Sequence, residues 1–232
     1  MIDACPDSAV LFFDVDGTLT FFDPDDMTDK DFSAVRPSRA VIEAFHRLRD
    51  AGHKAFICTG RPLWLIADSL RALEPAGIVA MAGATLEVEG RVVHEDCFDE
   101  DVIAELARRI SVAGGEALFE ANGATYSLEP VGVEQSFLLG AGVVHSVEEM
   151  RVDGRLRVGK VCLNAPNLAR VANDDGFIER NFELCNTGGE NRELSPKGID
   201  KGVGVARALE YLGRAGNACT FGFGDSGNDL GM

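Results

Sequence analysis

The stretch Val10-Leu11-Phe12-Phe13-Asp14-Val15-Asp16-Gly17-Thr18-Leu19-Thr20 decides the fold of this 232-residue chain. Its four consecutive apolar residues, 10–13, are typical of a buried strand in a parallel sheet. Asp14 and Asp16 follow where that strand ends, and Gly17 allows a turn that other residues avoid. Because ligands of open α/β sheets bind at the carboxyl ends of the strands, we expect both aspartates to lie in a site.

The spacing of these two aspartates suggests a cation site. Residues two apart in an extended backbone point to the same side, and two carboxylates held together favour a hard divalent cation such as Mg²⁺. A calcium-binding EF-hand loop is excluded, because Thr18 and Thr20 stand where further acidic ligands should follow. A solvated acidic turn is the remaining alternative, since a single DxDGT also occurs by chance. The rest of the chain must decide between them.

A second polar cluster ends the next predicted strand. Residues 37–52 predict a helix and residues 54–58 a buried strand, which together with the first strand make a βαβ unit. That strand runs into Thr59-Gly60-Arg61-Pro62, directly before another predicted helix. Free helix amides and a hydroxyl bind phosphate well, although a plain helix cap is the alternative for Thr59 and Gly60. Arg61 either contacts a substrate or pairs with a neighbouring acid.

Two further clusters come near the end of the chain. Lys201 stands at the start of a predicted helix, where the helix dipole disfavours a cation, so we expect an anionic partner for it. Lys197 is its near competitor, and a surface lysine is the alternative for both. Residues 219–223 then predict a strand that ends in Gly224-Asp225-Ser226-Gly227-Asn228-Asp229.

Between the second and third clusters the pattern changes to a hairpin (84–94), a helix (99–113), strands at 117–120, 124–128, 155–163 and 177–185, and a helix near 167–173. This mixed order predicts an α+β module inserted into a parallel-sheet domain. We place the core at residues 1–82 and 191–232 and the insert at 83–190. We expect solvent to surround the basic side chains of the strand at 155–163, which are Arg155, Arg157 and Lys160. The alternative is that they bind distal groups of a substrate.

Composition excludes several classes of function. Lysine and arginine number 22 against 38 acidic residues, and a net charge of −16 disfavours nucleic acid and anionic membranes as partners. The six cysteines show no paired spacing and no partner histidines, which argues against a zinc site. We find no signal peptide or apolar span, and expect a cytoplasmic monomer or homodimer.

The four clusters, in this order, resemble the motifs of the haloacid dehalogenase superfamily of phosphohydrolases: DVDGT, the TGR threonine, a lysine before a helix, and GDSGND. The position of the insert and the phrases CTGRP, Met81-Ala82-Gly83-Ala84 and SPKGIDKG are similar to its Cof-like sugar-phosphatase subfamily. Lys201 matches the family's lysine better than Lys197, because it immediately precedes the glycine and the helix. The resemblance implies an α/β fold with a Rossmann-like parallel-sheet core and an inserted α+β cap.

The same resemblance implies a magnesium-dependent phosphatase acting on small phosphorylated metabolites such as sugar phosphates, through an aspartyl-phosphate. Asp14 would be the nucleophile and Asp16 the general acid and base. Mg²⁺ would be held by Asp14, Asp225 and the backbone carbonyl of Asp16. The phosphoryl group would be bound by Thr59, Gly60, Lys201 and Asn228. Asp229 would orient Lys201 or a metal-bound water, and Arg61 is a possible substrate contact.

Two other functions remain open at this point. Phosphomannomutases of the same superfamily begin with a similar DVDGTLT, although GDSGND is closer to the phosphatase pattern. A non-catalytic binding protein that keeps the fold is the other alternative. It is suggested by the sequence ending at Leu230-Gly231-Met232, where family members continue through another strand and helix, so that one face of the sheet is expected to be bare.

Overall fold

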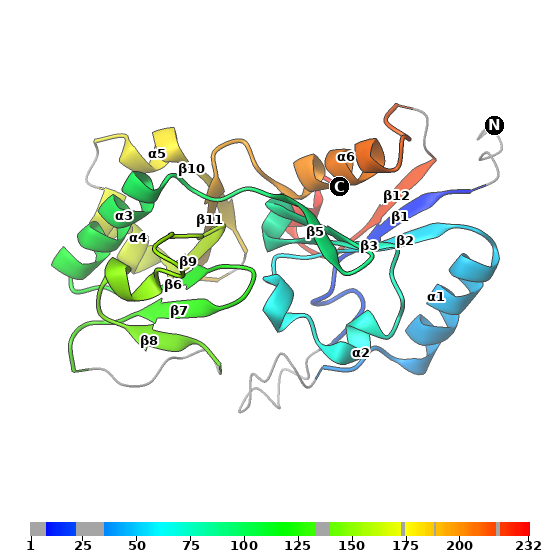
Figure 1. Cartoon of the computed structure of the whole chain (residues 1–232), viewed down its shortest axis with the longest axis horizontal. Coiled ribbons are helices and arrows are strands. Elements are labelled where there is room, and N and C mark those ends of the chain that lie inside the picture. Colours follow the sequence, from blue (N-terminus) through cyan, green and yellow to red (C-terminus); the bar gives the residue numbers. More distant parts are fainter. Residues whose placement is uncertain (1–7, 22–34, 133–139, 173–174, 188, 217–218) are drawn as a thin grey trace. The chain divides into compact units, whose positions relative to one another are not determined.

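The computed structural model describes residues 8–21, 35–132, 140–172, 175–187, 189–216 and 219–232 (Figure 1). The chain divides into two compact units, Met1–His94 with Asp200–Met232, and Glu95–Ile199. Each unit is built on a six-stranded sheet with helices, so the predicted α/β class is confirmed.

The sheet of the first unit has the strand order β12-β1-β2-β3-β4-β5. Strands β12, β1, β2 and β3 run parallel, and β4 is antiparallel to β3. The strand bounds are β1 (Val10–Phe13), β2 (Lys54–Cys58), β3 (Gly77–Ala80), β4 (Thr85–Val88), β5 (Arg91–Glu95) and β12 (Thr220–Phe223). The parallel pairing confirms the strands expected at residues 10–13, 54–58 and 219–223, and it brings their carboxyl ends to one edge.

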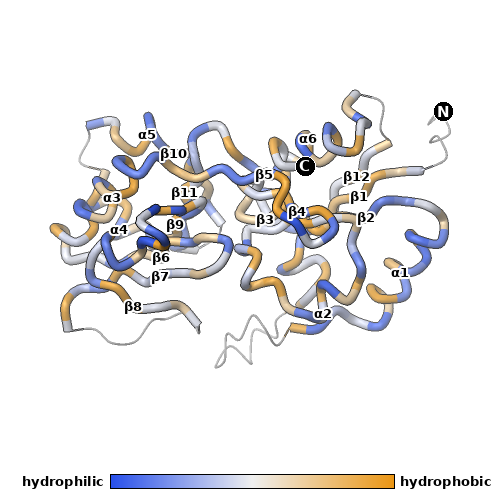
Figure 2. The backbone as a smooth tube through the Cα atoms, in the orientation of Figure 1, coloured by the Kyte–Doolittle hydropathy of each residue, from blue (hydrophilic) through white to orange (hydrophobic). Residues whose placement is uncertain are grey.

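Two apolar clusters fill this unit. One contains Phe45 and Ile57, and the other contains Phe12, Phe56 and Val205. The helices are α1 (Arg39–Asp50), α2 (Asp68–Arg71) and α6 (Lys201–Tyr211), with the short helices η2 (Leu63–Leu65), η3 (Met81–Gly83) and η5 (Gly227–Asp229). Helix α1 alternates between hydrophilic and hydrophobic residues, as expected for a helix with one buried side (Figure 2). Strand β12 is exposed along its length, and Phe221 and Phe223 are 47% and 42% exposed.

The boundaries between the units differ from those predicted. The hairpin β4–β5 extends the sheet of the first unit, because β4 pairs with β3 through Val79 and Leu86. The first division therefore falls after His94 rather than near Gly83. Strand β11 (Asn191–Pro196) pairs with strands of the second unit, so the second division follows Ile199 rather than residue 190. Alternation predicts a hairpin, but it does not say which sheet the hairpin joins.

The second unit has a mixed sheet with the order β10-β11-β9-β6-β7-β8. Neighbouring strands are antiparallel except for β7 and β8. The bounds not yet given are β6 (Ala117–Glu120), β7 (Thr125–Leu128), β8 (Gly142–Val144), β9 (Lys160–Asn164) and β10 (Phe182–Asn186). The strand predicted at 155–163 begins only at Lys160. The strand predicted at 177–185 is helix α5 (Phe177–Asn181) followed by β10.

The helices of this unit share one apolar core with the sheet. They are α3 (Glu100–Val112), α4 (Ala165–Ala172) and α5, together with the short η4 (Val147–Met150). Leu106 and Ile110 of α3 belong to the same buried cluster as Phe119, Val161 and Leu194 of the strands. Across the described residues of both units, every helix is too short or too polar to cross a membrane.

Candidate active site

Three of the predicted clusters meet at one edge of the first sheet. Asp14 directly follows β1, Thr59 directly follows β2, and Asp225 comes shortly after β12. The register aligns Phe13 with both Ile57 and Phe223, so the three strands end at the same level. The Asp14 amide donates to the carbonyl of Phe223 over 2.9 Å, which ties the first cluster to the last.

Lys201 joins this edge from the first turn of α6. Its side chain is almost fully buried, and its Nζ donates to Asp14 Oδ1 over 2.7 Å and to Asp229 Oδ1 over 2.6 Å. These carboxylates are the anionic partners that a lysine at a helix start requires. Burial alone would lower the pKa of Lys201, but Asp14 and Asp229 hold it above its ordinary value. Lys197, in contrast, is half exposed and pairs with Glu183 over 3.3 Å in the second unit.

The two carboxylates that Lys201 contacts have opposite pKa shifts. Burial raises the pKa of Asp14, and the Lys201 ammonium only partly opposes this rise. Burial acts on Asp229 in the same direction, but hydrogen bonds from Lys201 and the Ser226 amide outweigh it and lower the pKa. The second oxygen of Asp229, Oδ2, accepts from the amides of Asp225 (3.1 Å) and Ser226 (2.9 Å). Asp229 therefore fixes the turn that carries Asp225.

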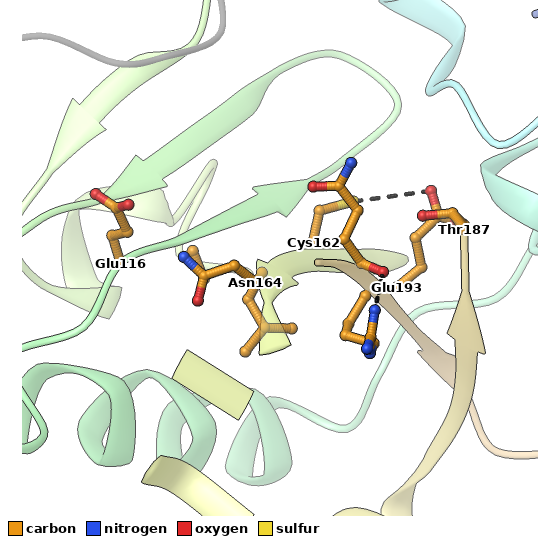
Figure 3. Close-up of a pocket in the computed structure, with 9 residues that line it drawn as sticks. Glu116, Cys162, Asn164, Thr187 and Glu193 are labelled. Atoms are coloured by element: carbon orange, nitrogen blue, oxygen red, sulfur yellow. Dashed lines mark hydrogen bonds between the residues drawn. The ribbon is translucent and has the colours of Figure 1, made fainter. Parts of the chain in front are cut away.

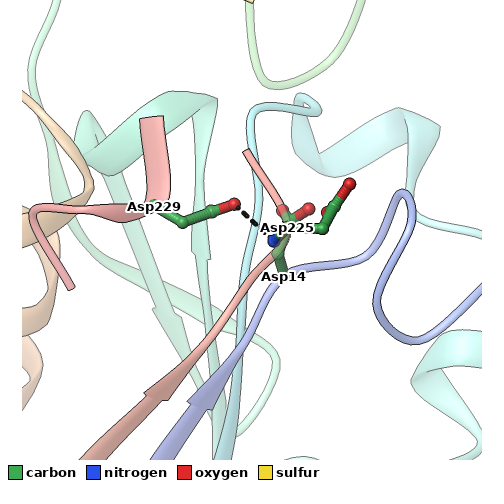
Figure 4. Close-up of side chains that lie close together, drawn as sticks. All are labelled: Asp14, Asp225 and Asp229. Atoms are coloured by element: carbon green, nitrogen blue, oxygen red, sulfur yellow. Dashed lines mark hydrogen bonds between the residues drawn. The ribbon is translucent and has the colours of Figure 1, made fainter. Parts of the chain in front are cut away.

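Asp14, Asp225 and Asp229 form an acidic group in which one carboxylate oxygen from each residue lies within 4.8 Å of the other two (Figure 4). Carboxylate oxygens are the ligands that hard divalent cations prefer, so this donor set fits Mg²⁺. Two of the three are the residues that sequence reasoning assigned a metal-binding side chain. The third, Asp229, was expected to orient Lys201 or a metal-bound water and not to bind the metal itself. The side chain of Asp16 lies outside the group.

Asp16 is instead bound by Arg61. The Nε of Arg61 donates to Asp16 Oδ2 over 2.9 Å, and its Nη2 donates to Asp16 Oδ1. Arg61 is itself 5% exposed, and its backbone amide donates to the hydroxyl oxygen of Thr59 over 3.2 Å. A planar guanidinium that contacts both oxygens fixes the carboxylate in position as well as in charge. Of the two alternatives for Arg61, the structure shows the pairing with a neighbouring acid.

The remaining predicted phosphate ligands lie beside these groups in the chain. Thr59 is fully buried, with Gly60 between it and Arg61, and its hydroxyl oxygen accepts a hydrogen bond from the Arg61 amide. Asn228 is partly buried in η5, and its Oδ1 accepts from Ser226 Oγ over 2.5 Å. Its side-chain amide nitrogen is the end that donates to a ligand.

Sequence reasoning missed two contributors to the geometry of the site. Thr18 Oγ1 donates to Asp225 Oδ1 over 3.3 Å, which links the first motif to the last. A Cβ atom at Gly17 would lie 2.3 Å from Asp225 Oδ2, and Gly17 has a φ of +88°. Only glycine therefore leaves room for Asp225 at this point. The glycine of DVDGT could be singled out from the sequence. That it lies against Asp225, 208 positions later, could not.

Comparison with known proteins identifies the family. A model of the haloacid dehalogenase-like hydrolases matches residues 11–232. The chain belongs to this family. This confirms the family that the four motifs predicted, and it makes the protein an enzyme of the haloacid dehalogenase hydrolase type.

Individual relatives of this haloacid dehalogenase-like hydrolase are distant. "Putative phosphatase YkrA" of Bacillus subtilis (strain 168) is 24% identical over 232 residues, which cover 97% of this chain and 82% of that protein. Among solved structures, the subclass IIB sugar phosphatase BT4131 has a TM-score of 0.71 at 23% identity, covering 97% and 83% of the two chains. For BT1666 from Bacteroides thetaiotaomicron the TM-score is 0.76 at 20% identity, covering 97% and 80%. These likenesses show a shared fold.

Proposed function

We propose that this hydrolase is a magnesium-dependent phosphatase that cleaves small phosphorylated metabolites through an aspartyl-phosphate on Asp14. The observation that carries the proposal is the contact of Lys201 Nζ with both Asp14 and Asp229, at the sheet edge where Asp225 and Thr59 also lie. Names of its relatives, a phosphatase and a sugar phosphatase among them, support the same reaction.

In the first step, a carboxylate oxygen of Asp14 attacks the phosphorus atom of the ester. The new bond joins that oxygen to phosphorus, and the bond from phosphorus to the alcohol oxygen breaks. Asp16 gives its proton to the departing alcohol. Arg61 contacts both oxygens of Asp16 in this structure, so one of these contacts must open before Asp16 carries the proton.

In the second step, water attacks the phosphorus atom of the aspartyl-phosphate. Asp16 takes a proton from the water, the bond between phosphorus and Asp14 breaks, and inorganic phosphate and the free Asp14 carboxylate are released. Asp16 ends protonated and ready for the next ester. One residue thus serves as acid and then as base, which requires it to be positioned rather than merely present.

The phosphoryl oxygens need donors throughout both steps. The Lys201 ammonium, the Thr59 hydroxyl and the Asn228 amide are such donors, and Gly60 allows the ligand to approach the backbone closely. Lys201 is already fixed by Asp14 and Asp229, so it stabilises developing charge without having to reorganise.

Asp14, Asp225 and Asp229 would hold Mg²⁺, and the bound ion would supply positive charge that screens the phosphate from the carboxylates. The second unit, Glu95–Ile199, is proposed to act as a cap that excludes water and selects the substrate.

The first test is phosphate release from a panel of phosphate esters, with and without Mg²⁺ and with excess EDTA. Wild type and Asp14→Asn are compared, with Asp101→Asn on the exposed start of α3 as the matched control. We expect release by wild type and the control, none by Asp14→Asn, and none with EDTA. A hydroxylamine-sensitive phosphoprotein should accumulate on acid quenching of the wild type.

Three results would contradict the proposal. Release by Asp14→Asn at a wild-type rate would remove its role as nucleophile. Activity that appears only with a bisphosphate activator would identify a phosphotransferase of the mutase type. No release from any ester by a well-folded protein would favour a binding protein that keeps the fold.

A further inference from the structure

The short helix η5, which carries Asn228, begins with a reciprocal pair of hydrogen bonds. Ser226 is its N-cap: the side-chain oxygen of Ser226 accepts from the backbone amide of Asp229, and the Asp229 carboxylate accepts from the backbone amide of Ser226. This capping box satisfies two amides that a helix start would otherwise leave without partners. The Ser226 oxygen is an acceptor in this arrangement, so its hydroxyl proton is left to bond elsewhere.

Two acceptors lie within reach of that proton. Ser226 Oγ lies 2.5 Å from Asn228 Oδ1 and 3.1 Å from Asp229 Oδ2. Asp229 Oδ2 is the more distant of the two, and it already accepts from the backbone amides of Asp225 and Ser226. A hydroxyl has a single proton, so the shorter contact is the one that it makes, and Ser226 donates to Asn228.

The same distance fixes which end of the Asn228 amide faces the serine. Hydrogen bonds of the O–H···O type span about 2.5–3.0 Å, and those of the N–H···O type span about 2.7–3.2 Å. A separation of 2.5 Å therefore fits a hydroxyl that donates to Oδ1, and it is too short for an amide nitrogen that donates to the hydroxyl. Because Oδ1 is turned toward Ser226, Nδ2 is turned away from it.

The orientation of this amide decides whether Asn228 attracts or repels a phosphoryl group. Nδ2 donates to a phosphoryl oxygen, whereas Oδ1 would repel it, since both atoms are acceptors. The two ends of the amide have nearly the same size, and Asn228 is only partly buried, so packing does not select one of them. The hydroxyl of Ser226 selects by chemistry, because it donates to an oxygen.

We propose that Ser226 is a positioning residue, whose hydroxyl holds Asn228 Oδ1 and thereby presents Nδ2 to the phosphoryl group. The inference rests on the proposed phosphatase function, in which Asn228 is a ligand of the phosphoryl oxygens. Ser226 acts through Asn228 and does not need to touch the substrate. The role requires a hydroxyl, which a helix cap as such does not, because glycine also serves as an N-cap.

Two substitutions separate the hydroxyl from the helix cap. Ser226→Thr keeps the hydroxyl, whereas Ser226→Gly removes it and retains an acceptable N-cap residue. The matched control is Ser38→Gly, because Ser38 is also an N-cap serine, on α1, and its side chain accepts from the Val41 amide over 3.3 Å. We would measure kcat and KM for p-nitrophenyl phosphate in each variant, and in Asn228→Ala with and without Ser226→Gly.

We expect Ser226→Gly to lower kcat/KM about fivefold, the usual effect of losing one hydrogen bond, while Ser226→Thr and Ser38→Gly keep it. In the Asn228→Ala background, Ser226→Gly should lower it by no more than about twofold, because the amide that Ser226 positions is gone. The Mg²⁺ concentration for half-maximal activity should be the same in Ser226→Gly as in wild type, whereas a displaced Asp225 would raise it.

Calorimetric binding of orthophosphate in the presence of Mg²⁺ gives a readout that needs no turnover. Ser226→Gly and Asn228→Ala should both weaken binding, because each removes the oriented Nδ2 donor. Ser226→Thr and Ser38→Gly should bind orthophosphate as wild type does.

The cavity of about 240 Å³ in the second unit should not contribute to this signal (Figure 3). Glu116 and Glu193 line it, and their negative charge would repel an anion. Arg192 also lines it, but its Nη1 already donates to Asn186 Oδ1. Sequence reasoning expected Lys160 to face solvent, but it is 3% exposed, and its Nζ lies 3.0 Å from Glu193 Oε1, so its charge is already balanced.

Failure of this inference is distinguishable from failure of the proposed function. Wild-type kcat/KM in Ser226→Gly overturns the inference, as does an equal loss in Ser226→Thr or Ser38→Gly, a full further loss in the Asn228→Ala background, or a raised Mg²⁺ requirement. Each of these results leaves the phosphatase in place. If wild type hydrolyses no ester, the proposed function is wrong, and orthophosphate binding decides the inference: the expected ranking supports it, and another ranking or no binding overturns it.

Discussion

Arg61 donates hydrogen bonds from Nε and Nη2 to both carboxylate oxygens of Asp16, and its backbone amide donates to Thr59 Oγ1. One buried arginine thereby couples the first motif to the second. A carboxylate held in this way keeps a single orientation, which general acid catalysis needs. The effect of this ion pair on catalysis can be measured by replacing Arg61.

Replacing Arg61 by Met should impair the hydrolysis of alkyl phosphates more than that of p-nitrophenyl phosphate. An alkoxide needs a proton to leave and p-nitrophenolate does not, so only the alkyl ester depends on a well-placed Asp16. General acid catalysis contributes about 10²–10⁴-fold, and we expect a loss of at least tenfold in kcat/KM for the alkyl ester. Arg71→Met, which breaks a 2.6 Å pair with Glu87, is the control. Equal losses for both esters would show that Arg61 does not act through Asp16.

Lys201→Ala should abolish most activity, by about 10²–10³-fold, whereas Lys197→Ala should change it little. Removing the buried ammonium also leaves Asp14 and Asp229 unpaired, so the free energy of unfolding should fall by about 3–5 kcal/mol. Urea unfolding separates the two effects. The double variant Lys201→Met, Asp229→Asn also removes one of the two carboxylates that the loss of the ammonium leaves unpaired. It should therefore regain stability but not activity. The reverse ranking of the two lysines would show that the wrong lysine had been matched to the motif.

Gly17→Ala and Gly52→Ala form a matched pair. Both glycines have a positive φ, +88° and +81°, so each substitution strains the backbone by about 1 kcal/mol or more. A Cβ at Gly52 meets nothing within 4 Å, whereas at Gly17 it would meet the carboxylate of Asp225. We expect both variants to melt at lower temperature and only Gly17→Ala to lose activity and to need more Mg²⁺. A similar loss in Gly52→Ala would trace the effect to stability alone.

Stability should fall at high pH because of Cys58. Burial raises the pKa of its thiol from 9.0 to about 12. Between these values the unfolded chain releases the proton and the folded protein keeps it, so stability decreases as pH rises, by at most about 1.4 kcal/mol per pH unit. Below pH 9 the thiol contributes no pH dependence. Cys58→Ala should show a shallower decline from pH 9 to 11 in urea titrations, and an unchanged slope would contradict the assignment to Cys58.

The sequence predicted much of the core and, in the second unit, the elements observed as α3, β6, β7 and α4. Residues 10–13, 54–58 and 219–223 are apolar runs that each end in polar residues, so both the strands and their shared edge followed from the pattern. Lys201 was preferred over Lys197 because it immediately precedes a glycine and a helix. The anionic partner expected for a cation at that position is supplied by Asp14 and Asp229.

What could not be predicted depends on which strand pairs with which. The hairpin predicted at 84–94 was assigned to the insert, although it joins the core sheet through β3. Lys160 was expected in solvent, because a lysine on a strand gives no sign that Glu120 and Glu193 lie on either side of it. Helix α5 was taken for a strand because it is short and β10 begins at the next residue, Phe182.

The position of β12 beside β1 has a consequence for how the protein is made. Asp14 leaves the ribosome more than two hundred residues before Asp225, and β1 has an open hydrogen-bonding edge until β12 arrives. A nascent chain can therefore assemble β1, β2 and β3 without any capacity for catalysis. Until β12 is synthesised, the exposed edge of β1 is the place where a chaperone would protect the chain and where another nascent chain would associate with it.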